Sequence, residues 1–232
     1  MINHVWAILW KAIKDTIKNK TILIQFVMFP CITIVMENAI SMEGLPAHYF
    51  ANMFSGMYIG MAPLTCVAAI ISEEKEKNTL RVLQMSNVKA YEYLMSNAVY
   101  VVSVCMIGSL VIGLAGGYSG VDLVKYLLLM LAGHFISVIV GAAIGTASKN
   151  QMMATSLTVP IMIVLSFLPM LSMFNDTIGK VSRFLFTGQI FILINNVSAL
   201  RLDWEAVLTL GANLLVGFAI FARIYRRSFG KK

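Results

Sequence analysis

The chain has 232 residues, of which 59% are hydrophobic and only 12% are charged. Soluble globular domains carry about 25% charged residues, so this composition excludes a soluble protein and indicates an all-α integral membrane protein. The net charge of +7 is explained by basic flanks of membrane helices near anionic headgroups, and no nucleic-acid partner is expected.

Several stretches of the chain are long enough to cross a bilayer. A hydrocarbon core about 30 Å thick requires about 20 mostly apolar residues per helix. What remains outside these stretches is too short for a second, soluble domain, so we expect a single transmembrane domain over residues 1–232. The six expected spans are 22–40, 53–71, 94–114, 123–146, 152–173 and 206–222.

Residues 1–20 precede the first span. Trp6, Leu9, Ile13 and Ile17 recur at helical spacing, while the lysines fall largely on the other side. This pattern predicts an amphipathic helix lying in the membrane interface. The alternative is a basic flank that has no function of its own.

The basic residues indicate how the chain is oriented. Lys and Arg concentrate before the first span, in the connection 72–93, at Lys149 and in the tail 223–232. Because cytoplasmic segments retain positive charge, both termini and the connection 72–93 are expected to be cytoplasmic. This orientation requires an even number of crossings.

The segment 174–204 is expected to lie on the outer face. Its part from 184 to 200 is apolar enough to suggest a seventh span, but a seventh crossing would place the basic tail outside. Gln189, Asn195 and Asn196 also argue against a full crossing, because unpaired amides are costly in hydrocarbon. We therefore predict a re-entrant helical element before the last span.

Two polar residues and two prolines inside the spans are candidates for a translocation path. His134 could form an interhelical hydrogen bond or touch substrate, and Glu37 could reach the headgroups or face a cavity. Pro160 and Pro169 interrupt the fifth span, where they could kink the helix toward a cavity or merely make it irregular.

Methionines provide a second set of path candidates. Met53, Met57 and Met61 lie on one face of the second span at i, i+4 and i+8, and Met162 lies on the fifth. Thioethers can bind a soft metal such as Cu(I), but a methionine stripe is more often an adaptable apolar surface. Both readings remain open from the sequence.

Three glycine pairs at GxxxG spacing permit close helix approach. They are Gly56 and Gly60, Gly113 and Gly117, and Gly141 and Gly145. Close approach at such pairs can occur within one bundle or across a dimer.

Motifs for catalysis are missing from the sequence. It contains no GxxxxGK[ST] loop, so the chain is not expected to hydrolyse ATP by itself, and HExxH and GxSxG are also absent. Cys31, Cys66 and Cys105 lie in spans without CxxC spacing, so no metal site is expected.

The connection 72–93 is the most strongly charged part of the chain. Glu73, Glu74 and Glu76 follow the second span, and residues 78–85 read as a short amphipathic helix. A charged element between two spans is suited to docking on a soluble partner. The alternative is a solvated loop that only retains basic charge.

This connection resembles the segment between the second and third helices of exporter-class (type-2) ABC transporter permeases. The family pattern is Glu-rich, followed by Gly-Thr-Leu-Glu, Leu-Leu, a turn and a Glu. Asn78 stands in place of the usual Gly, and Arg81 in place of Glu. The resemblance covers nearly the whole chain, because the family also has an interfacial N-terminal helix, six spans and a re-entrant outer element. The matching residues are Glu73, Glu76, Thr79, Leu80, Leu83, Ser86, Val88 and Glu92.

The resemblance implies a transport subunit rather than an enzyme, in a bacterial plasma membrane. It implies a permease that pairs with itself or a related permease and is served by two copies of an ABC ATP-binding subunit. No cofactor is expected on this chain, since ATP and Mg would bind the partner subunit. Residues implied to couple to the ATPase are Glu73, Glu74, Glu76, Thr79, Leu80, Arg81, Leu83 and Glu92.

The same resemblance implies a cargo path between two permeases, lined by the second and fifth spans. An apolar, methionine-rich path suits a hydrophobic or amphipathic cargo, such as an antimicrobial peptide, a drug or a lipid-like molecule. Two alternatives stay open: a non-transporting immunity or sensor protein that binds a peptide, and a copper-translocating permease.

Overall fold

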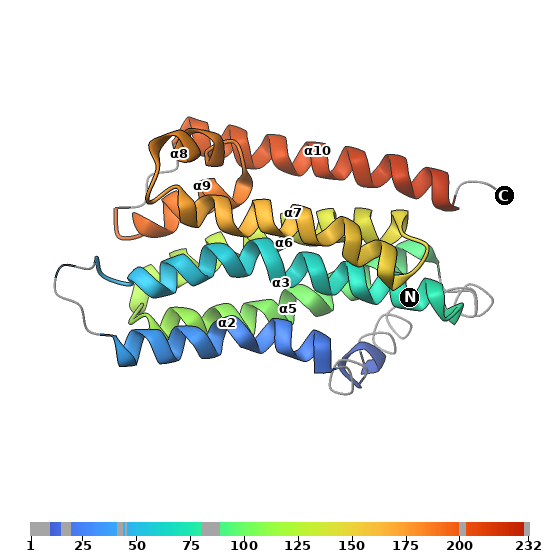
Figure 1. The fold of residues 1–232 in the computed structure, drawn as a ribbon, viewed down its shortest axis with the longest axis horizontal. Helices are drawn as coiled ribbons and strands as arrows, with labels where there is room; N and C mark the ends of the chain where they lie inside the picture. The colour runs from blue at the N-terminus through green and yellow to red at the C-terminus, as the bar shows by residue number, and fades with distance from the viewer. Residues whose placement is uncertain are drawn as a thin grey trace.

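The computed structural model describes residues 10–14, 20–40, 44, 46–79, 89–199 and 203–229. The regular secondary structure within these ranges is helical, with no strand. Six long helices run back and forth along one axis (Figure 1). They are α2 (Lys20–Ala39), α3 (Tyr49–Glu76), α5 (Ala90–Ala115), α6 (Gly120–Ala147), α7 (Gln151–Leu171) and α10 (Trp204–Phe229).

These six helices confirm the six expected spans, because each is long and apolar enough to cross a membrane. Several extend further than expected. α3 has 28 residues, which at 1.5 Å per residue gives about 42 Å and exceeds a core of about 30 Å. α10 likewise continues through residues 223–229 of the expected tail. Both helices therefore continue beyond the expected edge of the hydrocarbon core and include charged residues there.

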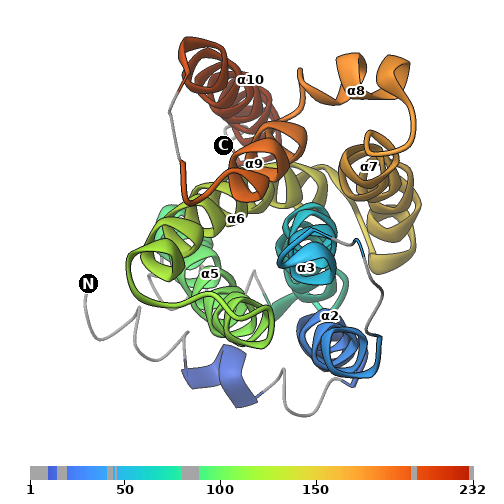
Figure 2. The ribbon, with the colours of Figure 1, turned by 90° about the vertical axis from the view of Figure 1, so that its left-hand side faces the viewer.

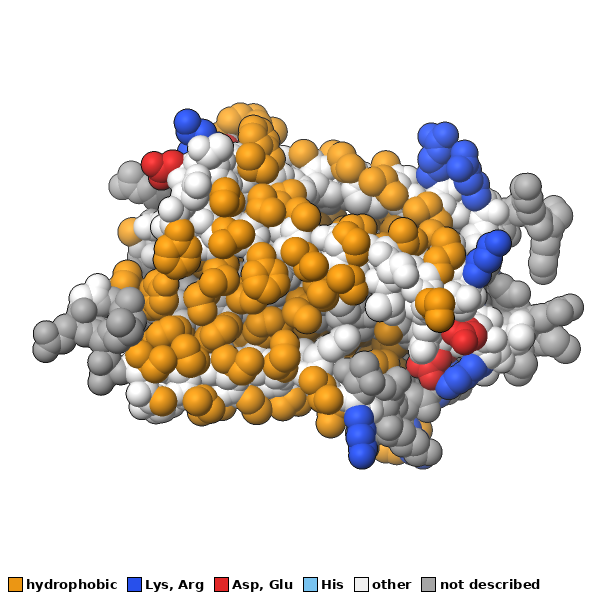
Figure 3. Space-filling view, viewed as in Figure 1, with side chains coloured by type: hydrophobic (Ala, Val, Ile, Leu, Met, Phe, Trp, Pro, Cys, Tyr) orange, Lys and Arg blue, Asp and Glu red, His pale blue; other side chains and the backbone are white. Residues whose placement is uncertain are grey.

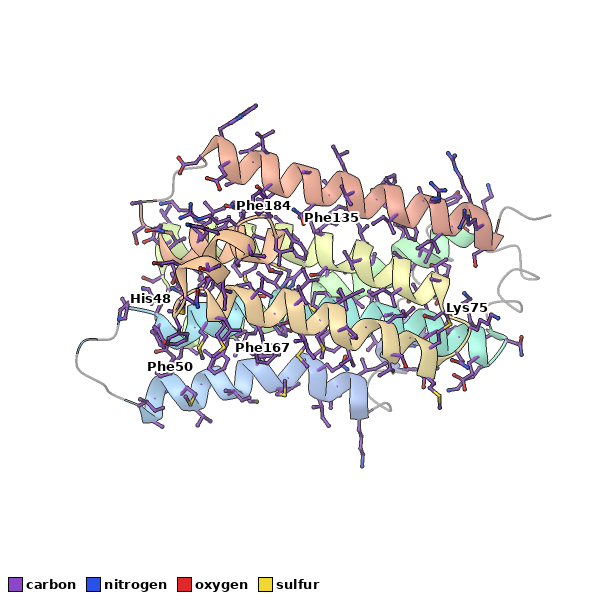
Figure 4. The ribbon with its side chains drawn as sticks, turned by 45° about the horizontal axis from the view of Figure 1, so that its top comes forward. His48, Phe50, Lys75, Phe135, Phe167 and Phe184 are labelled. Carbon is purple, nitrogen blue, oxygen red and sulfur yellow. The ribbon has the colours of Figure 1, made fainter. Side chains whose placement is uncertain are left out.

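The two ends of the bundle differ in charge. We call the end where α3 and α6 finish and α7 begins the basic end; Figure 3 shows most of the visible Lys and Arg side chains there, beyond an apolar middle. In Figure 4, Lys75 marks the basic end of α3 and His48 marks its opposite end. The described basic residues at the basic end are Lys11, Lys14, Lys20, Lys75, Lys77, Lys89, Lys149, Arg223, Arg226 and Arg227.

α3 is the central helix of the bundle. Viewed along the bundle axis, it lies among α2, α5, α6 and α7, whereas α10 lies on the outside against α6 (Figure 2). In the apolar, membrane-spanning stretch of α3, 83% of the residues are buried, whereas in that of α10 none is buried (0%). The surfaces of the outer helices are therefore left for lipid or for other subunits.

Glycines allow the backbones around α3 to approach closely. A Cβ at Gly141 of α6 would lie 2.4 Å from the backbone oxygen of Leu64 in α3. A Cβ at Gly60 of α3 would lie 2.8 Å from the backbone of Leu165 in α7. These glycines belong to two of the three GxxxG pairs, so their small size is used within the bundle.

A bent helix pair precedes α10. α8 (Asp176–Ser182) and α9 (Phe186–Asn195) meet at an angle of 113°. α9 has ten residues, about 15 Å, which is half of the hydrocarbon core. α7 ends and α10 begins at the end opposite to the basic end (Figure 1), so the pair enters and leaves on one side. The expected re-entrant element is thus confirmed.

The amides of this element have hydrogen-bond partners. Gln189 Nε2 donates to the carbonyl of Arg183 at 2.8 Å, and Asn196 Nδ2 donates to the carbonyl of Ile192 at 3.0 Å. Such bonds offset the cost of placing amides near hydrocarbon.

The N-terminal helix expected over residues 1–20 is described in part. Residues 10–14 are helical, Lys20 begins α2, and residues 1–9 and 15–19 lie outside the described residues.

The backbone contact at Gly141 generates a stability prediction. Gly141→Ala places a methyl group against a carbonyl that cannot move without separating α3 from α6, at a cost of about 1–3 kcal/mol. We expect a lower midpoint of thermal unfolding, measured by circular dichroism in detergent. Gly211→Ala in α10 is the matched control, because no described atom lies within 4 Å of its added Cβ. Equal midpoints for the two variants would contradict the close packing.

Candidate functional site

The basic end of α3 stops at a left-handed residue. Asn78 has φ 56°, and its N–H donates to the carbonyl of Lys75 at 3.2 Å. Thr79 Oγ1 donates to the carbonyl of Glu74 at 3.1 Å. Helices commonly end with such a residue, usually Gly and sometimes Asn, because other side chains are strained there. Asn78, which stands where the family usually has Gly, therefore adopts the left-handed conformation that ends the helix.

The last turn of α3 carries four consecutive charged residues. Glu73 pairs with Lys77 on the same helix at 2.5 Å, near the surface, where such pairs contribute little to stability. Glu74 pairs with Lys11 of the N-terminal helix at 2.5 Å, and its side chain is only 13% exposed. Glu74 thus fixes the described part of the N-terminal segment to α3.

The next two residues contact both sides of the α6–α7 turn. Lys75 Nζ donates to the carbonyl of Thr146, in the last turn of α6, at 2.5 Å. Glu76 Oε2 accepts from the backbone N–H of Gln151, the first residue of α7, at 2.9 Å. A cation near a helix C-terminus and an anion near an N-terminus both complement the helix dipole. We call these two bonds the α6–α7 clamp.

Glu92 has a structural role at the start of the next helix. Its Oε2 accepts from the backbone N–H of Lys89 at 3.1 Å, which caps α5, and the residue is 6% exposed. Its carboxylate is therefore turned toward its own helix start. Three more residues expected to couple to an ATPase, Leu80, Arg81 and Leu83, lie outside the described residues, as do Ser86 and Val88.

A groove of about 340 Å³ lies between α2, α3 and α7. Met61 and Met162 line it, and Thr65 on its wall donates to Gln25 Oε1 at 2.8 Å. The lining residues come from the halves of α2 and α7 nearer the basic end (Figure 1). Among the residues that the structure describes, the lining is Ile22, Gln25, Met61, Thr65, Ala69, Gln151, Ala154, Thr155, Thr158, Val159 and Met162, and none of these is charged.

The structure separates the other expected path residues from this groove. Met53 and Met57 are half-buried and pack against the core. Pro160 is exposed on α7, and Pro169 is buried. Of the four methionines considered, Met61 and Met162 are the two that line the groove.

His134 lies in the core between α3, α5 and α6. It is fully buried, and its Nε2 lies 2.7 Å from Ser109 Oγ of α5. Tyr58 of α3 meets the imidazole edge to face, with ring centroids 5.5 Å apart. The interhelical hydrogen bond considered from the sequence is present, and His134 does not line the groove.

Sequence reasoning missed a polar network at the opposite end of the bundle. Asn52 of α3 accepts from the Tyr118 hydroxyl at 2.6 Å and donates to Asn195 Oδ1 at 3.0 Å. Glu37 of α2 accepts from the backbone N–H of Ala51, near the start of α3, at 2.9 Å. An asparagine at position 52 of an apolar stretch was the sequence feature that could have indicated this network, but its partners, Tyr118 and Asn195, are distant in sequence. Glu37 of α2 therefore caps the start of α3. This role differs from the two considered from the sequence, in which Glu37 reaches the headgroups or faces a cavity.

The six long apolar helices and the bent pair α8–α9 define a multi-pass membrane protein. A family model described as "ABC-2 family transporter protein" matches residues 11–225. The chain belongs to this family and is a membrane permease of an ABC transporter, a transport subunit rather than an enzyme. The family also implies association with an ABC ATP-binding subunit. No curated protein matches the chain.

The left-handed conformation of Asn78 generates a second stability prediction. Asn78→Val should lower the thermal unfolding midpoint, because a β-branched residue in this conformation costs about 1–2 kcal/mol. Asn78→Gly is the matched control and should keep or raise the midpoint, since glycine adopts positive φ without strain. The side chain is exposed, so neither change removes buried contacts. Equal effects of Val and Gly would rule out backbone conformation as the cause.

Proposed function

We propose that this chain is the permease of an ATP-driven exporter that moves a hydrophobic or amphipathic cargo out of the cell. The observation that carries the proposal is the uncharged groove beside α3, the helix whose end bears the charged connection. One helix thereby contributes both a wall of the groove and a candidate contact with the ATPase.

The chemistry of the groove supports an amphipathic cargo. Met61, Met162, Ile22 and Val159 supply apolar surface, and hydroxyl and amide groups supply hydrogen bonds. Binding sites for small molecules commonly combine apolar walls with a few polar groups. With no charged side chain among the described residues that line it, the groove favours neutral or weakly charged groups of a peptide, drug or lipid-like molecule.

The proposed assembly contains two permeases and two ATP-binding subunits. α2 and α7, which border the groove, are largely unburied within this chain, so a second permease could cover them. In this arrangement the groove contributes to a path between the two permeases. ATP and Mg bind the partner subunits, and both termini and residues 72–93 lie in the cytoplasm.

The proposed mechanism is alternating access driven by nucleotide. ATP binding closes the pair of ATP-binding subunits and favours one permease conformation over the other. ATP can shift the permease only by the difference in its affinity for the two conformations, and contacts at the charged connection transmit that difference. The permease then opens its path toward the outside.

Two other functions make different demands. Copper translocation would require thioethers along the path, and of the second-span methionines only Met61 lines the groove. A sensor or immunity protein would bind a peptide without needing an ATPase. Both alternatives are resolved by the experiments that follow.

Partner binding is tested by purification from native membranes. The wild-type chain should co-elute with an ABC ATP-binding subunit and show vanadate-sensitive ATP hydrolysis. Lys77→Glu/Arg81→Glu should reduce co-elution, because reversed charges oppose docking on a complementary surface. The matched control Lys180→Glu/Arg183→Glu reverses two basic residues at the opposite end and should retain it. Absence of any ATP-binding subunit from the wild-type eluate would favour the sensor alternative.

Cargo binding is tested by filling the groove. Thr155→Trp places an indole in the groove and should raise the cellular accumulation of amphipathic fluorescent dyes, measured by fluorescence. Ile163→Trp is the matched control, because Ile163 is exposed on the same helix but does not line the groove. Equal accumulation in the two variants would contradict the assignment of the groove.

The same assay separates amphipathic export from copper transfer. Met53→Leu/Met57→Leu/Met61→Leu keeps apolar volume but removes the thioethers, so dye export should persist. Copper sensitivity of cells carrying this variant, in the absence of dye export by the wild-type chain, would establish the metal alternative.

A further inference from the structure

We propose that the α6–α7 clamp, formed by Lys75 and Glu76, transmits movement of the charged connection to α7 and thereby moves one wall of the groove. The inference rests on the proposed function, because the movement originates in the ATP-binding subunits. It assigns Glu76 a role as a positioning residue that acts on α7.

The clamp belongs to a set of contacts that reach in three directions from one turn of α3. Glu74 binds Lys11 of the N-terminal segment, Lys75 binds the end of α6, and Glu76 binds the start of α7. Three consecutive residues therefore connect α3 to three other elements. Any displacement of this turn must move those elements or break the bonds.

The two clamp bonds hold the α6–α7 turn from both sides. Lys75 meets a carbonyl in the last turn of α6, and Glu76 meets the first N–H of α7. The connection between these helices is only residues 148–150. Each bond joins a charged side chain to a backbone group of opposite partial charge. Such charge-assisted bonds are stronger than hydrogen bonds between neutral groups.

α7 carries the clamp bond and the groove on the same segment. Gln151 donates its backbone N–H to Glu76 and also lines the groove, followed by Ala154, Thr155 and Thr158. A helix moves as a stiff unit over a few turns, so displacement at Gln151 displaces these lining residues. The groove wall is therefore directly attached to the charged end of α3.

α7 also has a fixed point and a place to bend. Gly60 of α3 approaches the backbone at Leu165 and Ser166 so closely that a Cβ there would lie 2.8 Å away. Pro160 lies between this contact and the clamp, and its ring leaves one helical hydrogen bond unmade. Sharp bends in helices occur at such prolines. Pro160 thus provides a point at which residues 151–159 can move relative to 165–166, with a shift in the packing of the buried Ala154 and Thr158.

The experiment measures the groove wall directly and needs no identified cargo. Thr155→Cys is introduced with Cys31→Ala, because Cys31 is exposed whereas Cys66 and Cys105 are buried. The complex is purified with its ATP-binding subunit, and the rate of labelling by a maleimide is compared without nucleotide and after trapping with ATP and vanadate. In this background the two rates should differ.

Adding Glu76→Ala should bring the ratio of the two rates closer to one, because the coupling free energy carried by the bond from Glu76 to Gln151 is lost. Glu76→Gln, which keeps an acceptor oxygen, should give an intermediate ratio, and it decides the matter if Glu76→Ala does not fold. A wild-type ratio in both variants would overturn the inference. Loss of the ATP-binding subunit from either variant would also overturn it, since Glu76 would then be a docking residue.

Asn150→Ala is the matched control. Asn150 caps the same helix start by accepting from the N–H of Met153 at 2.9 Å, but it belongs to the α6–α7 turn and does not reach α3. It should leave the ratio near the wild-type value. If Asn150→Ala also abolished the ratio, general weakening of the α7 start would explain the result and the clamp would be rejected.

Failure of the proposed function gives a different result from failure of the inference. Without an ATP-binding subunit in the wild-type preparation, both are rejected. With the subunit bound and a nucleotide-dependent ratio that Glu76 variants do not change, the proposed function stands and the clamp alone is rejected.

Discussion

Backbone contact between α3 and its neighbours is the constraint on which the rest of the structure depends. At Gly141 and Gly60 the side chain is reduced to hydrogen, so that α6 and α7 reach the α3 backbone directly. Helices in lipid gain little from burying apolar groups against each other and associate instead through such close packing. α3 becomes the buried axis of the bundle, and any element joined to it shares its position.

Three carboxylates in this apolar chain serve helix starts. Glu37, Glu76 and Glu92 each accept a backbone N–H at or near the start of a helix, two of them on a helix other than their own. Helix starts leave N–H groups without intrahelical partners, and at a membrane boundary such groups need another acceptor. Retaining charged residues in an otherwise apolar sequence is thus partly a structural requirement.

Charged residues at the start of the connection between the second and third spans also make contacts within the chain. Glu74, Lys75 and Glu76 hold other parts of the same chain, while Glu73 and Lys77 pair with each other. A partner protein that moves this connection would act on α6 and α7 as well as on α3. The groove between α2, α3 and α7 lies beside the same contacts. In the proposed function, partner docking and cargo binding therefore share one helix.

The membrane environment, the six spans, the re-entrant pair and the family could be predicted from the sequence alone, because they depend on local hydrophobicity, length and charge spacing. The sequence also indicated the interhelical bond of His134. It did not determine that Glu76 reaches Gln151, that Glu37 reaches Ala51, or that Met61 lines the groove while Met53 does not. Those facts depend on which helix faces lie together. Close packing around α3 decides this in three dimensions, because the partners are distant along the chain.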